Sequence, residues 1–496
     1  MRPSPEVRLR QQLVGIAALA AILSAGRMAS AQDAATIISQ TSKAMGADGL
    51  TSISYSGTAA DVNFLQTKNI NGPWPLRPIT GYTRAIDLTQ VASRASGATM
   101  NQGLFGGAPV VGRFNQGITP QNIVWIQQLD YWVTPWGFLK GAAANAATVK
   151  TLKANGSSYW VVTWSPPVKA PSAVAYQVKG YINSQHLIDR VETWVDHDML
   201  GDMHVDTVYD AYKDFGPLKV PTKMVQKRGG FTFFEVTVAD AKANPADLAQ
   251  LLAPPPPPAG RGLAGPPPPS PAGAQAPPPS TKLADGVYKI NGAYNALAVE
   301  FKDYIMVIEG PQSIARGEAI VDEVTRLFPR KPIRYVVNTH PHSDHSSGLS
   351  PFVAEGATIV TCDNNKAFFQ RTFSAPRTLV GDHLAKAPRK PKVEGIGEKK
   401  VYKDNTHSVE LYHIIDADLE KVHSDGILVA FLPKEKILFQ ADFTLPAAGA
   451  MPNPFVQSLG ASLAKLKLDF DQYISVHNTP LQQTRADLMK AVGISY

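Results

Sequence analysis

A short segment in the C-terminal half of the chain concentrates side chains that bind metal ions. Residues 338–345 read NTHPHSDH, an HxHxDH pattern whose candidate ligands are His340, His342, Asp344 and His345. Side chains two positions apart in an extended chain project to the same side, so His340 and His342 can bind one cation together. Asp344 and His345, after the chain bends, can face a second position. A purely structural role is disfavoured, because four such side chains would need several hydrogen-bond partners if they were buried.

This segment resembles that of the metallo-β-lactamase superfamily of metal-dependent hydrolases. Members of the family carry a later histidine, a later aspartate and a final histidine, and all three are present in order as His423, Asp442 and His477. The resemblance covers roughly residues 283–496. It implies an α/β fold for this part of the chain, arranged as an αββα four-layer sandwich, and a hydrolytic activity that depends on bound metal.

The resemblance also implies a centre with two metal ions. The implied ligands are His340, His342 and His423 for the first metal, Asp344, His345 and His477 for the second, and Asp442 as the bridge. Imidazole and carboxylate ligands favour zinc, two ions per chain, although iron or manganese would accept the same set. Two such cations about 3.5–4 Å apart can share a hydroxide, which is a nucleophile near neutral pH. Asp344 is also the candidate catalytic residue, because a carboxylate beside that hydroxide could orient it or pass a proton to the leaving group.

Two of the later ligands have rivals of the same residue type. The rivals are His407 and His413 for His423, and Asp416 and Asp425 for Asp442. His423 is favoured because an SDG turn and an apolar strand pattern follow it, and Asp442 because it follows an apolar strand pattern. His477 has no rival, since it is the only histidine after His423. His383 lies in a loop rich in Lys and Pro, which could either reach the pocket or remain a solvated surface.

The chain departs from the family pattern at two positions. Glu309 stands where the family often has aspartate after its first hairpin, and we expect it to hydrogen-bond to the loop that carries the metal ligands. Asn478 stands where the family often has glycine after the final histidine, and it could reshape the floor of the pocket. Neither change removes a ligand. The single cysteine, Cys362, has no evident base beside it and is expected to be a small buried residue.

Alternating strand and helix patterns surround the candidate ligands. The sequence predicts a hairpin across Lys302 and Asp303, a helix over 314–328 and a short buried strand over 333–337. The HxHxDH segment follows this strand directly. In layered α/β folds, reactive groups collect in loops beyond the carboxyl ends of strands, so this position favours a functional site.

A proline-rich segment separates this unit from the rest of the chain. Residues 251–282 contain 13 of the 40 prolines, which excludes a helix or a sheet and predicts an extended linker. Upstream, residues 33–250 open with a short helical pattern and continue with runs of period-two alternation, such as 159–164 and 231–238. These runs are rich in β-branched and aromatic residues, and they predict a mostly antiparallel β domain.

The first residues of the chain have the features of a secretory signal. Arg2, Arg8 and Arg10 precede an uncharged run of about 14 residues, which is shorter than the roughly 20 residues needed to span a bilayer as a helix. Small residues follow this run and end at Ala31. We therefore expect residues 1–31 to be a signal peptide, the mature chain to lack a transmembrane segment, and the protein to be exported to the periplasm or secreted.

Composition narrows the function further. A chain of 496 residues exceeds one compact core, and its net charge of +7 comes from scattered basic residues, so nucleic-acid binding is not expected. A single cysteine excludes intrachain disulfides and a thiolate zinc cage. We predict an exported hydrolase that cleaves an ester, thioester, lactone, amide or phosphodiester in a small molecule, with β-lactams as a minority option. The alternative is an envelope carrier protein whose β domain holds an apolar ligand.

Overall fold

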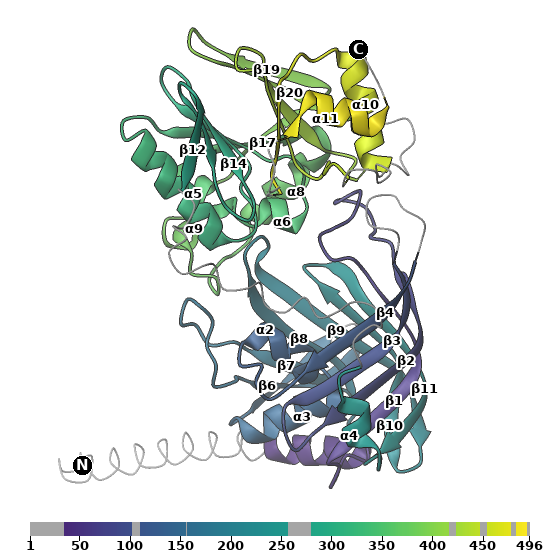
Figure 1. Cartoon of the computed structure of the whole chain (residues 1–496). Helices are drawn as coiled ribbons and strands as arrows, with labels where there is room; N and C mark the ends of the chain where they lie inside the picture. Colours follow the sequence, from purple (N-terminus) through teal and green to yellow (C-terminus); the bar gives the residue numbers. More distant parts are fainter. Residues whose placement is uncertain are drawn as a thin grey trace, which may run out of the picture.

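A computed structural model describes most of the chain (Figure 1). The described residues are 34–101, 110–154, 156–255, 279–415, 423–446, 454–477 and 483–493. The expected signal peptide and most of the expected linker lie outside these residues. Among the described residues, no helix combines the length and apolar composition that crossing a bilayer requires.

The N-terminal unit is built on one antiparallel sheet of eleven strands. The strands are β1 (Ser52–Asp61), β2 (Arg77–Asp87), β3 (Ala92–Asn101), β4 (Val110–Ile118), β5 (Thr148–Ala154), β6 (Ser157–Trp164), β7 (Val178–Ile182), β8 (Ile188–His197), β9 (Gly201–Phe215), β10 (Leu218–Arg228) and β11 (Phe231–Ala243). Their order in space is β4-β3-β2-β1-β11-β10-β9-β8-β7-β6-β5, so the pairing of β1 with β11 joins two runs of consecutive hairpins. The prediction of a mostly antiparallel β domain is confirmed.

Helices cover one face of this sheet and bury its aromatic side chains. They are α2 (Trp125–Trp132) and α3 (Pro135–Ala144), with a helix over 34–44 at the start of the unit. The short α4 (Leu248–Leu252) at the end of the unit has no buried residue and contacts β2 and β3. Thr134 caps α3, because its hydroxyl accepts a hydrogen bond from the Gly137 amide at 3.0 Å. Gly180 of β7 lets the Phe138 ring of α3 approach the strand, since a Cβ atom there would lie 2.2 Å from the ring. Side chains of α2, α3 and the helix over 34–44 thus share one apolar core with the strands.

The C-terminal unit contains two sheets. The first has the order β12 (Ser280–Ala284), β13 (Val287–Ile290), β14 (Ala296–Glu300), β15 (Ile305–Ile308), β16 (Ile333–Val337), β17 (Thr358–Cys362) and β18 (Lys392–Ile396). The second has the order β19 (Lys399–Lys403), β20 (Ser408–His413), β21 (Leu428–Leu432), β22 (Ile437–Gln440), β23 (Gln472–Ser475) and β24 (Gln483–Thr484). Strand β12 begins inside the segment that we expected to be linker.

Apolar cores lie between the two sheets and on their outer faces. The helices are α5 (Ile314–Leu327), α6 (Ser343–Ser346), α7 (Ser350–Glu355), α8 (Asp363–Phe373), α9 (His383–Lys386), α10 (Pro454–Leu466) and α11 (Arg485–Val492). Residues of both sheets, such as Val299 and Leu411, form the central core. Side chains of α5, α7 and α8 pack on the first sheet, and side chains of α10 and α11 pack on the second.

The elements that lead to the HxHxDH segment match the sequence expectations. Strands β14 and β15 form the expected antiparallel hairpin, α5 occupies the expected helical stretch, and β16 ends at Val337. The start of α5 is fixed by Ser313, whose hydroxyl accepts a hydrogen bond from the Arg316 amide at 3.2 Å. Strand β16 pairs with β15 and β17 in parallel, so its carboxyl end opens at the same edge as theirs.

The two units are in direct contact, which no sequence pattern indicated. In Figure 1, α6 lies on the side of the C-terminal unit that faces the N-terminal sheet. The loop between β1 and β2, residues 62–76, places Leu65, Ile70 and Trp74 in the same buried cluster as Phe352 of α7. We call this segment the β1–β2 loop. It brings the N-terminal unit to the metal-ligand segment.

Candidate metal centre

The loop after β16 presents the HxHxDH side chains. The backbone is extended at His342 (φ −60°, ψ 149°) and then turns into the short helix α6, in agreement with the predicted bend. The Asn338 amide group supports this turn by donating hydrogen bonds to the His345 carbonyl at 3.2 Å and to the Ser346 hydroxyl at 3.1 Å. His340 and His345 are fully buried, so their rings face the interior of the site.

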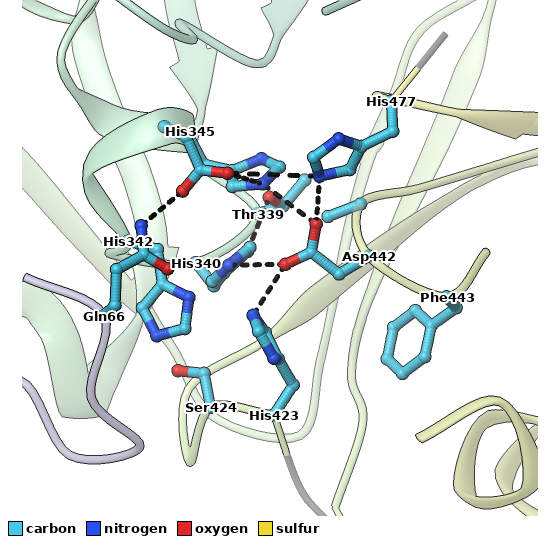
Figure 2. A network of polar contacts seen from close by, with 12 residues as sticks. Gln66, Thr339, His340, His342, His345, His423, Ser424, Asp442, Phe443 and His477 are labelled. Atoms are coloured by element: carbon cyan, nitrogen blue, oxygen red, sulfur yellow. Dashed lines mark hydrogen bonds and ion pairs between the residues drawn. The ribbon is translucent and has the colours of Figure 1, made fainter. Parts of the chain in front are cut away.

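The structure brings all seven predicted metal ligands together. They form two groups, within each of which the potential ligand atoms lie no more than 4.8 Å apart: His340, His342, His423 and Asp442 in one, and Asp344, His345 and His477 in the other. Figure 2 shows four of the imidazole rings directed at the Asp442 carboxylate. The later residues arrive from separate elements, since Asp442 follows β22, His477 follows β23 and His423 precedes β21.

The Asp442 carboxylate lies between the two groups. Its Oδ2 atom is 3.1 Å from His340 Nε2 and 2.6 Å from His423 Nε2. Its Oδ1 atom is 3.0 Å from His345 Nε2 and 2.5 Å from His477 Nε2. One carboxylate oxygen therefore faces each group, which is the arrangement that a bridging ligand needs.

The donor atoms fit divalent cations. His342 donates from Nε2 to the Thr67 carbonyl at 3.1 Å, and its buried Nδ1 has no hydrogen-bond partner among the described residues. A buried ring nitrogen with a free lone pair beside other nitrogen and oxygen donors is suited to a metal ion such as zinc. The donor set contains imidazole and carboxylate groups without thiolate, since the only cysteine is Cys362.

Electrostatics divide the ligands into neutral and charged groups. Burial, together with the neighbouring His345, lowers the pKa of His340 to about 4, and burial holds the pKa of His342 well below its ordinary value. Burial opposes the charge on Asp442, but the neighbouring His345 and His340 hold the pKa of this carboxyl well below its usual range. Two neutral imidazoles and a carboxylate are the protonation states that bind metal.

His345 behaves differently from the other buried histidines. Burial lowers its pKa, but the carboxylates of Asp442, Asp344 and Glu309 outweigh burial and raise the pKa well above the ordinary value. A cation bound between these carboxylates would therefore replace a proton on His345.

Glu309 supports the ligand loop from behind. Its buried carboxylate accepts a hydrogen bond from the Thr339 hydroxyl at 2.6 Å and lies 3.4 Å from His345 Nδ1. The sequence expectation that Glu309 hydrogen-bonds to this loop agrees with these contacts. Glu309 has a positive φ of 87°, a backbone conformation that residues other than glycine rarely adopt.

Three residues at the site were missed by sequence reasoning. The Gln66 side-chain amide donates to Asp344 Oδ1 at 2.7 Å, and the Tyr294 hydroxyl donates to Asp344 Oδ2 at 3.2 Å. Thr67 contributes the backbone carbonyl that accepts from His342. Gln66 and Thr67 lie in an irregular loop about 275 residues before the ligands they touch, so no local pattern could have indicated them.

Both rival histidines have other partners. His413 contacts the backbone carbonyl of Asp425, and His407 contacts the carbonyls of Glu300 and Asp285. His383 is 63% exposed and lies near Glu318. Cys362 is buried, as expected, and burial raises the pKa of its thiol well above the ordinary value. Asp416 and Asn478 lie outside the described residues.

Comparisons with known proteins agree with this geometry. Residues 310–477 match the sequence model of the family described as the Metallo-beta-lactamase superfamily. A curated relative, the 2,4-dinitroanisole O-demethylase subunit alpha of Nocardioides sp. (strain JS1661), is 24% identical over 195 residues, which cover 38% of this chain and 53% of the relative. The chain thus spans about half the length of this relative.

Several solved structures are similar to the C-terminal part of the chain. The DIM-1 metallo-β-lactamase is 16% identical with a TM-score of 0.32, and the match covers 43% of this chain and 94% of that one. A metallo-β-lactamase from Pontibacter korlensis has the same identity and TM-score, with coverages of 43% and 96%. The sec-alkylsulfatase Pisa1 from Pseudomonas sp. is 17% identical with a TM-score of 0.31, and coverages of 43% and 40%. The family match, which contains all seven ligand candidates, identifies the C-terminal part of this chain as a metallo-β-lactamase superfamily domain.

Proposed function

We propose that this protein is a metal-dependent hydrolase that uses two divalent cations, most simply zinc, to cleave a small-molecule ester, thioester, lactone, amide or phosphodiester. The observation that carries the proposal is the position of Asp442, whose two oxygens face two separate groups of ligands. The proposed assignment is His340, His342 and His423 for one cation, Asp344, His345 and His477 for the other, and Asp442 as the bridge. We also propose that the sheets and helices of this domain form the four-layer αββα arrangement.

The protein's own side chains prepare the site for hydrolysis. When bound, divalent cations would supply Lewis acidity and lower the pKa of water toward neutrality. Asp344 is 30% exposed at its side chain, so it can meet both solvent and substrate. Gln66 and Tyr294 donate hydrogen bonds to its two oxygens, which fixes the carboxylate. Asp344 is thereby placed to orient a water molecule and to pass a proton to the leaving group.

The decisive experiment measures metal and turnover together. Purified protein should contain close to two equivalents of metal per chain, and chelation should remove both the metal and the hydrolysis of chromogenic probes. The panel should contain an ester, a thioester, a lactone, a β-lactam and a phosphodiester. An aryl methyl ether should be included as well, because the Nocardioides relative is named as an O-demethylase of 2,4-dinitroanisole. Protein that carries two metal equivalents and cleaves none of these probes would contradict the proposed substrate range.

A second candidate function is ligand carriage by the N-terminal unit, and one cavity favours it. The cavity is lined mainly by apolar and aromatic side chains and includes Tyr55, Arg84, Asp130, Val133, Met224 and Phe234. Arg84 is buried, and its Nε atom has no hydrogen-bond partner among the described residues. Asp130 forms an ion pair with Arg228 at 2.7 Å. Arg84 and Arg228 together carry two positive charges and Asp130 carries one negative charge, so one positive charge remains. A buried cation of this kind favours an apolar ligand with an anionic head.

Calorimetric titration with octanoate tests carriage separately from hydrolysis. Binding to the wild-type protein that is lost in Arg84→Met, with metal content unchanged, would support it. Equal binding by both proteins, or no binding by either, would contradict it.

We further propose that the protein is exported after removal of residues 1–31. Expression in a bacterial host followed by N-terminal sequencing should give a mature protein that begins at Gln32. An unprocessed N-terminus in material from the cytoplasm would contradict this proposal.

A further inference from the structure

Four consecutive residues of the β1–β2 loop contact the parts of the chain that carry the candidate metal ligands: three contact the HxHxDH segment, and the fourth contacts Asp425, two residues after His423. The Leu65 carbonyl accepts a hydrogen bond from the Ser343 amide at 3.1 Å, and the Lys68 carbonyl accepts one from the Asp425 amide at 3.0 Å. Between them, the Gln66 side chain donates to Asp344 at 2.7 Å and the Thr67 carbonyl accepts from His342 at 3.1 Å. Two of these four contacts are made to proposed metal ligands.

We propose that the β1–β2 loop of the N-terminal unit is a functional part of the metal centre, in which Thr67 and Gln66 are positioning residues for His342 and Asp344. The inference rests on the proposed function and deepens it, because it makes cation binding in the C-terminal unit depend on the N-terminal unit.

Thr67 determines which ring nitrogen His342 offers to a cation. A neutral imidazole carries one proton, and the hydrogen bond made by one nitrogen decides which nitrogen keeps it. The Thr67 carbonyl can only accept, so the proton stays on Nε2 and the lone pair stays on Nδ1, which is buried within the first ligand group. The carbonyl therefore orients the ring and selects the tautomer that can bind metal.

Gln66 fixes the carboxylate of Asp344 without neutralising it. Its amide binds Oδ1, which leaves Oδ2 at 3.3 Å from His345 Nε2 and 4.0 Å from His477 Nε2. A lysine or arginine at this position would add a positive charge beside a cation site, whereas an amide donates a hydrogen bond and adds no charge. Gln66 is thus chemically suited to hold a metal ligand.

The loop is rigid enough for this role. Leu65 and Ile70 are fully buried, and the Trp74 ring stacks on Phe231 of the sheet with centroids 4.0 Å apart. Asn69 closes the turn, because its side-chain oxygen accepts from the amides of Asn71 and Gly72, each at 2.9 Å. Packing and hydrogen bonds on both sides therefore fix the position of Gln66 and Thr67.

Cation titration of the metal-free full-length chain tests the inference without reference to turnover. Gln66→Ala should weaken binding of the second cation by about 10–100-fold, which is the usual effect of removing a partner that orients a ligand. The affinity for the first cation should change little. Gln66→Met keeps the volume of the side chain but lacks the donor, so it should show the same loss. The cobalt(II) absorption spectrum of both variants should change in the bands of the second site. Gln185→Ala, at an exposed turn of the same unit, is the matched control and should bind both cations like the wild-type protein.

The outcomes separate this inference from the proposed function. Wild-type protein that binds no cation would contradict the proposed function, and the inference with it. Wild-type protein that binds two cations, together with Gln66→Met that binds both equally tightly and has an unchanged cobalt spectrum, would overturn the inference alone. Far-UV circular dichroism establishes that the variants are folded. If only Gln66→Ala fails to fold, Gln66→Met decides the question.

Discussion

The two ligand groups of the candidate metal centre, which we call its two halves, differ in burial and in charge. The first half, His340, His342 and His423, is made of imidazoles, and His340 is fully buried. The second half, Asp344, His345 and His477, opens toward solvent, with side-chain exposures of 30% for Asp344 and 34% for His477. From this difference we propose that the first half is a closed cation site and that substrate and water reach the centre from the second half. Asp344, which we propose as the proton-transfer residue, belongs to the second half.

The largest loss of cation binding and of hydrolysis is expected from a change at Asp442, where the two halves meet. Asp442→Ala removes the carboxylate that faces both groups, so both cations should bind weakly and hydrolysis should fall by more than about 100-fold, since even residues that only orient ligands cost about 10–100-fold. Metal analysis and turnover of the best probe measure this effect. Asp303→Ala, at an exposed position of the same unit, is the control and should retain both cations. A variant at Asp442 that keeps two equivalents of metal would show that the halves do not share this ligand.

Single-ligand variants should distinguish the halves. His342→Ala removes a ligand from the closed half, whereas His477→Ala removes one from the open half. We expect His477→Ala to retain about one equivalent of metal and His342→Ala to lose the cation of the first half, because each change leaves the other ligand set intact. Metal content after dialysis against a weak chelator measures the outcome. Equal losses from both variants would mean that the two cations bind only as a pair.

The pH dependence of cation binding should also differ. The raised pKa of His345 means that its ring is protonated at neutral pH without metal, so cation binding to the second half must release that proton. Affinity there should rise about tenfold per pH unit between about pH 6 and about pH 8. His340, with a pKa lowered to about 4, is already neutral in this range, so the first half should change less. Calorimetric titrations at three pH values give both slopes, and equal slopes would contradict the predicted difference.

The smallest effect on cation affinity is expected from a variant that changes only the second half. Tyr294→Phe removes the hydrogen bond from the Tyr294 hydroxyl to Asp344 Oδ2 and keeps the ring that lies against His477. A hydrogen bond of about 0.5–1.5 kcal/mol corresponds to roughly a 2–10-fold weaker second cation. Tyr288→Phe, whose ring packs against Phe328, is the matched control. An unchanged second affinity in Tyr294→Phe would show that Gln66 alone fixes Asp344.

The sequence was most informative where chemistry and local pattern coincide. The HxHxDH segment follows an apolar run that forms β16, and a short spacing of unusual residue types needs no tertiary information to be recognised. The hairpin of β14 and β15 and the helix α5 could also be predicted, because their periodicity is strong.

The remaining features depend on contacts between distant segments. The pairing of β1 with β11 joins strands about 180 residues apart, and no local periodicity encodes such a pairing. Gln66 and Thr67 lie in a loop without regular pattern, and their role depends on how one unit packs against the other. A glutamine and a backbone carbonyl have no distinctive sequence signature, so these partners of Asp344 and His342 could be found only in three dimensions.

The burial of Trp74 has a consequence for how the molecule unfolds. A side chain from the N-terminal unit occupies the apolar core of the C-terminal unit, in the cluster that contains Phe352 and Phe368. Neither unit can lose its structure without exposing apolar surface on the other, which couples their melting. Heating the protein in a calorimeter should therefore give a single cooperative transition that includes both units.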